Sequence, residues 1–325
     1  MGQPNIRGNL VSGPLQNVSV LYYPKDYVGD QVFPLINSQS PEAKIGKFLK
    51  GAWSRDDAGI RAPGTRAKRG GYDITSVSID AKEYARAMEV TQEDRRLAAL
   101  ANSLPMQPEA EAIEFCTHKI LLKKEVRIAS LVTGSTWDTT NEDCNGNWAA
   151  AATTNTFIVD VFGAIESIYS NTGLRPNRLL VSFNTWIQLL QVSGVIDRIK
   201  YIMKGIIDQN TIAQIFGLDQ IIIAGMVKNS AKETKAGTEF TISRIWETNS
   251  GKGGAFLYYA PSSPGLRTPS AGYQTRVAYD SGIYREVRTY YEAAEKQDVY
   301  EVSENVDITQ IASDLGHYFY DTIAD

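Results

Sequence analysis

The pattern of apolar residues between Pro108 and Gly134 predicts one long helix. Pro108 suits the first helical position, where its missing N–H would have no intrahelical partner. No other Gly or Pro follows until Gly134, which we expect to act as the C′ residue that ends the helix. Acidic residues gather in its first turns and basic residues in its second half, which is the order that the helix dipole favours.

Apolar side chains fall on two sides of this helix instead of on one stripe. One side carries Ile113, Cys116, Ile120 and Leu131, and the other carries Phe115, Leu122 and Val126. A helix that is apolar on two sides is contacted from two sides. The pattern suits the central helix of any mixed domain. It also suits a spine helix with a sheet on one side and something else, such as another subunit, on the other.

The densest apolar periodicity lies in residues 158–225 and predicts a compact unit of mixed helices and strands. Its first helix is expected to be capped by Asn155 or Thr156 and to stop at Gly173. The other expected elements are short buried strands at 179–181 and 218–224, a helix from Asn184, and a helix capped by Asn210 and Thr211 and ended by Gly217. Residues 226–290 then have the pattern of strands and turns.

The chain before the long helix has a different character. Residues 1–41 hold apolar residues only in twos and threes between prolines, which predicts an extended arm that lies on another surface. Residues 42–69 carry eight basic and three acidic side chains with dense turn signals, and residues 72–79 alternate as a half-exposed strand would. We expect a long basic β-excursion with little core of its own, or else a flexible surface hairpin. Thr91 is expected to cap a short helix that reaches Ala101.

Composition narrows the classes of function. The chain has 325 residues, with 43% hydrophobic and 22% charged residues, which is typical of a soluble protein. Its net charge of −4 indicates that the chain as a whole does not bind nucleic acid through a basic surface. Nine acidic residues and one lysine lie in residues 292–325, so the charge is segregated.

Cys116 and Cys144 do not form a disulfide framework and are expected to be reduced thiols. The sequence shows neither a secretory signal pattern nor an apolar run of membrane-spanning length.

Motifs for catalysis or cofactor binding are absent from the sequence. His118 and His317 lack a second ligand at metal-binding spacing, and no nucleophile elbow or glycine-rich phosphate loop occurs. Residues 141–152 imitate the start of a calcium loop, but Ala152 stands where a bidentate Glu is required, so a plain Asx-turn loop is the alternative. We therefore expect no catalytic residues, no cofactor and no metal, and a binding or structural role.

Three stretches together resemble the major capsid proteins of tailed phages, which have the Hong Kong 97-type fold. The first is residues 158–225, and its most specific part runs from Thr172 through Gly173, Pro176 and Asn177 to a helix that carries Trp186, Leu189 and Leu190. The second is the succession of broken arm, basic excursion and long helix. The third is the return to strands and an acidic end. The match is one of order and pattern over most of the chain.

The resemblance implies an α+β fold with an N-terminal arm, an extended β-hairpin E-loop, a long spine helix, a peripheral domain and an α/β axial domain. The corresponding boundaries are 1–41 for the arm, 42–90 for the E-loop, 91–155 for the spine helix and first part of the peripheral domain, 156–285 for the axial domain, and 286–325 for the return to the peripheral domain. The protein would then be a non-enzymatic major capsid protein, a structural subunit that self-assembles into the pentamers and hexamers of an icosahedral bacteriophage shell. We expect it in the virion capsid, after assembly in the host cytoplasm.

The resemblance also implies partners. These are other copies of the chain, a scaffolding protein and portal, any decoration protein, and packaged double-stranded DNA bound without sequence specificity, with no membrane. Because the arm starts almost at Met1, we expect a separate scaffolding protein or none. Lysines in the loop (Lys50, Lys68) and the late Asn305 do not by themselves assign a covalent Lys–Asn cross-link.

Charge complementarity leads to a hypothesis about contacts between subunits. The basic excursion of one subunit would lie over the acidic peripheral region of the next. The residues expected in this contact are Lys44, Lys47, Lys50, Arg55, Arg61, Arg66, Lys68, Arg69, Glu295, Asp298, Glu301 and Glu304.

Two alternatives remain at this stage. The first is an encapsulin-like cellular nanocompartment with the same fold, which would enclose protein and not DNA. The second is an intracellular hydrolase that uses unrecognised carboxylates. A hydrolase would leave the basic excursion and the apolar arm without a purpose.

Overall fold

The computed structural model describes residues 27–48, 55–56, 58–71, 74–100, 107–137, 141–152, 154–200, 208–232, 240–247, 252–264, 268–279 and 282–323. The expected N-terminal arm therefore lies mostly outside the described residues. None of the described helices combines the length and the apolar composition of a membrane-spanning segment.

Helix α6 (Pro108–Gly134) is the long helix that the sequence predicts, with proline in its first turn. Gly134 is its last helical residue and not the C′ residue, so that prediction is wrong. The chain leaves α6 through Ser135 in an extended conformation, and the Ser135 N–H donates to Leu131 O at 3.1 Å. This exit buries Trp137, whose Nε1 donates to Val132 O at 2.8 Å and so satisfies another carbonyl of the last turn.

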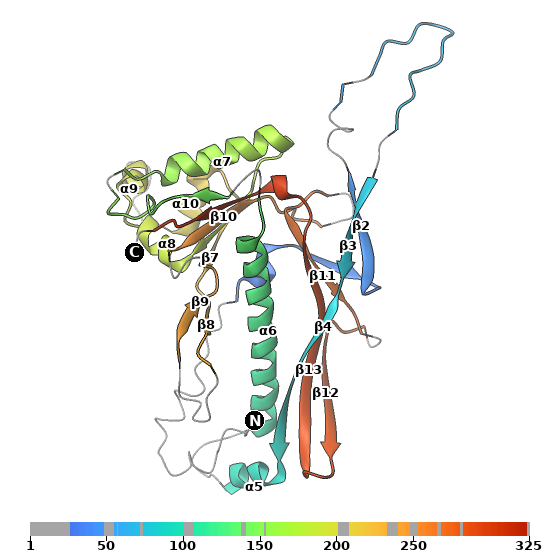
Figure 1. Cartoon of the computed structure of the whole chain (residues 1–325), viewed down its shortest axis with the longest axis vertical. Coiled ribbons are helices and arrows are strands. Elements are labelled where there is room, and N and C mark those ends of the chain that lie inside the picture. The colour runs from blue at the N-terminus through green and yellow to red at the C-terminus, as the bar shows by residue number, and fades with distance from the viewer. Residues whose placement is uncertain are drawn as a thin grey trace.

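A long antiparallel sheet lies along one side of α6 (Figure 1). Its central strand β13 (Gln297–Gln310) pairs on one edge with β4 (Lys82–Thr91). The other edge pairs with β12 (Arg285–Glu292) and then with β11 (Gly272–Val277), and β11 also pairs in parallel with β1 (Leu35–Ser38). Helix α5 (Gln92–Leu100) follows β4, and its Thr91 cap is confirmed. The Asp94 N–H donates to Thr91 Oγ1 at 3.2 Å.

The compact unit expected from residues 158–225 is present beside the upper end of α6 (Figure 1). Its sheet has the order β5-β14-β10-β6-β7, in which β6 and β7 are parallel. The strands are β5 (Glu142–Asp143), β6 (Arg178–Ser182), β7 (Gln220–Ala224), β10 (Gly254–Tyr258) and β14 (Gly316–Tyr320). The helices are α7 (Phe157–Thr172), α8 (Phe183–Leu189), α9 (Ser193–Lys200) and α10 (Gln209–Phe216).

Local signals in this unit are confirmed except at two caps. Gly173 and Gly217 end α7 and α10 in the left-handed conformation, with φ of 73° and 62°. Helix α8 is capped by Ser182 and not begun by Asn184, and α10 is capped by Asp208, whose carboxylate accepts from the Thr211 N–H at 2.8 Å. In both cases a polar residue two positions before the predicted asparagine occupies the N-cap position.

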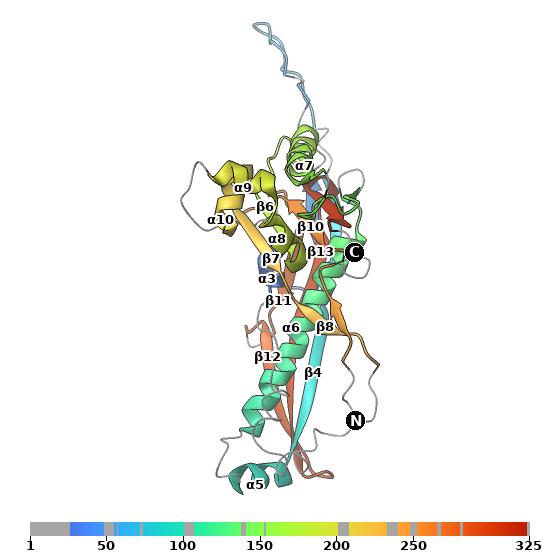
Figure 2. The ribbon, with the colours of Figure 1, turned by 90° about the vertical axis from the view of Figure 1, so that its left-hand side faces the viewer.

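Two hairpins complete the chain. Strands β2 (Glu42–Phe48) and β3 (Ile74–Asp80) form a two-stranded sheet from which residues 58–71 project far beyond the rest of the chain (Figure 1). Strands β8 (Val227–Asn229) and β9 (Ile242–Arg244) form the second hairpin, which lies near α6 in both views (Figure 2). The short helix α3 (Gly29–Val32) and the 3-10 helix η2 (Ser313–Leu315) are the other described elements.

Sheet membership crosses the expected domain limits. Strand β11 lies within residues 156–285 but belongs to the long sheet, and β14 lies within residues 286–325 but belongs to the compact sheet. Strand β4 begins within residues 42–90, ends at Thr91, and also belongs to the long sheet. The two sheets are therefore interleaved along the sequence.

The main core is aromatic where the chain passes from α6 into the compact sheet. The Trp137 and Phe256 rings lie 4.6 Å apart, and Phe256 stacks on Tyr258 at 4.8 Å. Gly316 borders them, and a Cβ at this position would be 2.6 Å from Trp137 and 2.9 Å from Phe256. Only glycine fits between these rings.

We expect Gly316→Ala to lower the free energy of unfolding by about 1–3 kcal/mol, because buried rings must move to admit one methyl group. Urea denaturation measures the change. Gly163→Ala is the matched control, because a Cβ at Gly163 in helix α7 has nothing within 4 Å and alanine favours a helix interior by about 1 kcal/mol. Equal destabilisation by both variants would contradict the packing argument.

Candidate assembly surfaces and the charged joint behind them

The basic residues expected in contacts lie on the β2–β3 excursion. Lys44, Arg55, Arg61, Arg66, Lys68 and Arg69 are exposed, whereas Lys50 and the side chain of Lys47 lie outside the described residues. The backbone here is held by a local turn, in which the Thr65 N–H donates to Ala62 O at 3.2 Å. These cations are thus presented on an extended segment and are not collected into a pocket.

The four acids expected to receive them differ in availability. Glu295 is exposed and Glu301 is half-buried. Asp298 pairs with Arg95 at 2.6 Å. Glu304 is only 6% exposed and lies 3.5 Å from Lys124 Nζ and 3.0 Å from an Arg285 nitrogen. Glu304 is therefore occupied by cations of its own chain and cannot reach a neighbour's surface.

An acidic sheet face that sequence reasoning missed lies on the side of the long sheet away from α6. Tyr300 and Val302 of β13 pack against α6, so the intervening residues face the other way. Strand register gathers Glu83, Ala85, Ala87, Glu89, Glu286, Arg288, Tyr290, Glu292 and Glu301 on this face. Five carboxylates surround exposed alanines on this face, and its one arginine, Arg288, pairs with Glu286, so the face is negative. The sequence signal that could have revealed this face is the alternation between Glu83 and Glu89, where every second residue is Glu or Ala.

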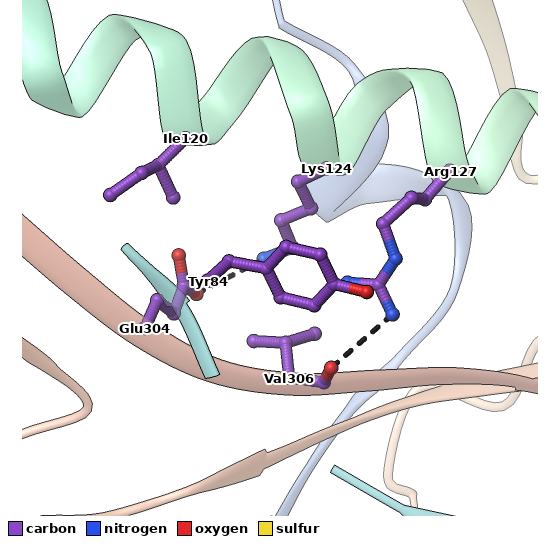
Figure 3. Close-up of a pocket in the computed structure, with 6 residues that line it drawn as sticks. All are labelled: Tyr84, Ile120, Lys124, Arg127, Glu304 and Val306. Atoms are coloured by element: carbon purple, nitrogen blue, oxygen red, sulfur yellow. Dashed lines mark hydrogen bonds and ion pairs between the residues drawn. The ribbon is translucent and has the colours of Figure 1, made fainter. Parts of the chain in front are cut away.

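Between α6 and the sheet lies a small charged cluster (Figure 3). Tyr84, Ile120, Lys124, Arg127, Glu304 and Val306 line its pocket. The guanidinium of Arg127 lies 4.1 Å from the centre of the Tyr84 ring and donates to Val306 O at 3.3 Å. The cavity volume is about 10 Å³, which is the room of about one water molecule. The cluster is thus part of the packing between helix and sheet and is too small for a substrate.

The second side of α6 is covered by the chain's own residues 27–33. The Tyr27 hydroxyl contacts the His118 ring, and Lys124 forms an ion pair with Asp30. Glu125 is 1% exposed and accepts hydrogen bonds from the Gly29 N–H at 2.6 Å and from Trp246 Nε1 at 2.6 Å. The expectation of contacts on two sides is confirmed, and at this level the second contact comes from the same chain. Phe115, nearer the start of the helix, is 38% exposed.

The other chemical candidates have structural environments. Within the described residues no three His, Cys, Asp or Glu side chains converge as metal ligands. Residues 141–146 form the Asx-type turn, in which the Asn145 N–H donates to Asp143 Oδ1 at 3.0 Å. His317 Nε2 lies 3.0 Å from Glu142, and burial raises the pKa of the Cys144 thiol.

No protein-family model matches this chain. The major capsid protein of Burkholderia phage BcepMu is 25% identical over 281 residues, which covers 82% of this chain and 83% of that protein. A phage-related protein from Bordetella bronchiseptica RB50 is similar in structure, with a TM-score of 0.68, 19% identity, and coverage of 96% of this chain and 97% of that one. The capsid protein of cyanophage P-SCSP1u has a TM-score of 0.61 at 11% identity, with coverage of 92% and 89%.

The chain has the fold of the tailed-phage major capsid proteins. Sequence and fold similarity together make it a structural subunit of a capsid shell and not an enzyme. The holo-SrpI encapsulin complex of Synechococcus elongatus PCC 7942 is also similar, with a TM-score of 0.52, 11% identity and 96% coverage of both chains. The capsid protein is the better supported of these two.

The ion pair of Lys124 with Glu304 yields a stability prediction for this chain. Lys124→Met leaves Glu304 with Arg285 as its remaining cation and leaves the exposed Asp30 to solvent, so we expect the unfolding free energy to fall by about 1–3 kcal/mol. Lys123→Met, on the exposed neighbour, should change it by less than about 0.5 kcal/mol. Urea denaturation of both variants measures the difference, and equal effects would show that the pairing contributes nothing.

Glu125 gives a prediction about pH. Burial raises its pKa above the usual carboxyl range, against hydrogen bonds that lower it. The folded chain therefore binds this proton more tightly than the unfolded chain, so protonation adds stability as pH falls through the folded-state pKa. We expect the unfolding free energy of the wild type, relative to the non-titrating Glu125→Gln, to increase as pH falls from 7 to about 4.3, the ordinary pKa of Glu. Urea titrations across this range test it, and a constant difference or an opposite slope would contradict it.

Proposed function

We propose that this chain is the shell subunit of a tailed-phage virion and forms pentamers and hexamers around packaged double-stranded DNA. The observation that carries the proposal is the similarity to the BcepMu capsid protein over four-fifths of both chains, joined to a shared capsid fold. Assembly would take place in the host cytoplasm, with scaffolding protein, portal and any decoration protein as further partners. A net-negative subunit suits an inner wall that does not hold the genome tightly, since the genome must leave again.

The elements fit the parts of such a subunit. The β2–β3 hairpin and its projecting residues 58–71 would be the E-loop, and α6 the spine helix. The long sheet would belong to the peripheral domain and the compact sheet with α7–α10 to the axial domain. Because the sheets are interleaved, we draw these domains by sheet membership: β4 and β11 join the peripheral domain and β14 joins the axial domain.

We further propose that the basic excursion of one subunit lies on the acidic sheet face of the next. Residues 58–71 present Arg61, Arg66, Lys68 and Arg69, and all four side chains are exposed. The opposing face presents five carboxylates around the small side chains of Ala85 and Ala87, so an extended segment could approach the sheet closely. Glu295 and Glu301 keep their expected role, whereas Asp298 and Glu304 act within their own subunit. Exposed charges of this kind steer association and are screened by salt.

An encapsulin-like nanocompartment is the second candidate because of the likeness to the Synechococcus protein. It differs in what the shell encloses. Particles formed during expression would contain nucleic acid or packaged phage DNA in one case and a protein cargo in the other, so the absorbance ratio and protein content of purified particles separate the two.

The test of the docking is a charge reversal with a matched control. Arg61→Glu, Arg66→Glu and Arg69→Glu together should reduce the yield of closed shells or rings at least tenfold at low salt, because like charges then meet across the contact. Light scattering and negative-stain microscopy measure the yield across a salt series. Reversing Lys119, Lys123 and Lys232 changes the net charge equally at exposed sites elsewhere.

A second variant makes the test specific. Reversing Glu83, Glu89 and Glu301 to lysine in the chain that carries the reversed loop should restore assembly, because opposite charges face each other again. Unchanged assembly of the loop variant, or no rescue by the double reversal, would contradict the proposed contact. A chain that stays monomeric in every form, with and without a scaffolding protein, would contradict the shell function itself.

A further inference from the structure

Residues 27–38, which we call the strap, connect the two sheets of the protein. At one end β1 pairs in parallel with β11 at the edge of the long sheet. In the middle, Gln31 O accepts from Arg178 Nη1 at 2.7 Å, and Arg178 belongs to β6 of the compact sheet. Gln274 of β11 donates to Gly29 O at 2.6 Å and to Phe33 O at 3.0 Å. A short segment near the N-terminus is thus fixed to both units at once.

Glu125 is where three separate parts of the chain meet. Its Oε2 accepts from the Gly29 N–H at 2.6 Å, and its Oε1 accepts from the Val28 N–H at 3.4 Å, so one carboxylate holds the start of the strap. The same Oε1 accepts from Trp246 Nε1 at 2.6 Å. Trp246 is 2% exposed and is part of the main core of the compact unit. The carboxylate itself is carried by α6, which packs on the long sheet.

The fit at this point is close. A Cβ on Gly29 would lie 2.6 Å from Glu125 Oε2 and 2.8 Å from Ile128 Cδ1, so the strap can approach α6 only through a glycine. All three donors to Glu125 are neutral, and the adjacent Lys124 is directed to Asp30 and Glu304. A buried charge held only by neutral donors depends on every one of them, because each lost bond leaves it less compensated.

We propose that Glu125 is a joint that couples the strap to the compact unit through Trp246. Loosening of the Trp246 segment releases the start of the strap, and release of the strap frees the Trp246 segment. Glu125 therefore acts with the contacts of Gln31 and Gln274 to fix the strap between the two sheets. The inference concerns the isolated subunit and does not depend on shell assembly.

The decisive experiment removes a bond that the strap does not itself make. Trp246→Phe deletes the indole N–H donor to Glu125 and keeps an aromatic ring in the core. We expect amide hydrogen exchange of residues 28–33, followed by mass spectrometry on the full-length subunit, to become about tenfold faster, although the substituted residue lies more than 200 positions away. If exchange becomes faster only in residues 240–247, the proposal is overturned.

The matched control is Trp148→Phe. Trp148 is buried in the compact unit and donates from Nε1 to Asp160 at 2.7 Å, so the substitution deletes the same kind of bond at another place. It should accelerate exchange near the start of α7 and leave the strap unchanged. Equal acceleration of the strap by both variants would mean general destabilisation and would overturn the joint.

Glu125→Gln tests the joint from the helix. A carboxamide offers one acceptor oxygen where the carboxylate offers two, so we expect faster exchange in the strap and in residues 244–247 together, with β13 unchanged. If only one of the two segments responds, the coupling is absent. Should this variant not fold, the comparison of Trp246→Phe with Trp148→Phe still decides the question.

Discussion

Two neighbouring residues at the middle of α6, Lys124 and Glu125, are both buried, and both bind the strap as well as a second part of the chain. Lys124 pairs with Glu304 on the long sheet and with Asp30 of the strap, whereas Glu125 accepts hydrogen bonds from the strap and from Trp246. A buried charge is tolerated only with partners in place. The two residues therefore require that sheet and strap lie where they do, and the rest of the subunit is arranged around that requirement.

Much of the fold could be predicted because its signals are local. The length of α6, the glycine stops after α7 and α10, and the strands β6 and β7 depend on spacing within a few residues. What could not be predicted depends on pairing across the chain. Strand β1 aligns with β11 some 240 positions later, and its partner Gln274 carries no local mark of that role. The caps at Ser182 and Asp208 were missed for a smaller reason, since several polar residues compete at each turn.

The candidate contact surface follows the same division. The basic excursion is contiguous in sequence and was found. The acidic face draws alternate residues from three strands, so it becomes visible only when register is known. Register also explains why Glu304, one of nine acids near the C-terminus, is part of the interior: it lies on the side of β13 that faces Lys124, whereas Glu301 lies on the other side.

Residues 58–71 are exposed throughout, so within one subunit little holds the segment, and in the proposed docking a neighbour would hold it. Ordering such a segment consumes part of the energy that its contacts release, and each single contact is correspondingly weak. Weak contacts are reversible contacts. A growing lattice of such subunits can discard a wrongly placed member before its other neighbours close around it, whereas the completed lattice is held by many contacts at once. A long excursion with few contacts in its own subunit would thus favour accurate shell assembly over tight binding between any two copies.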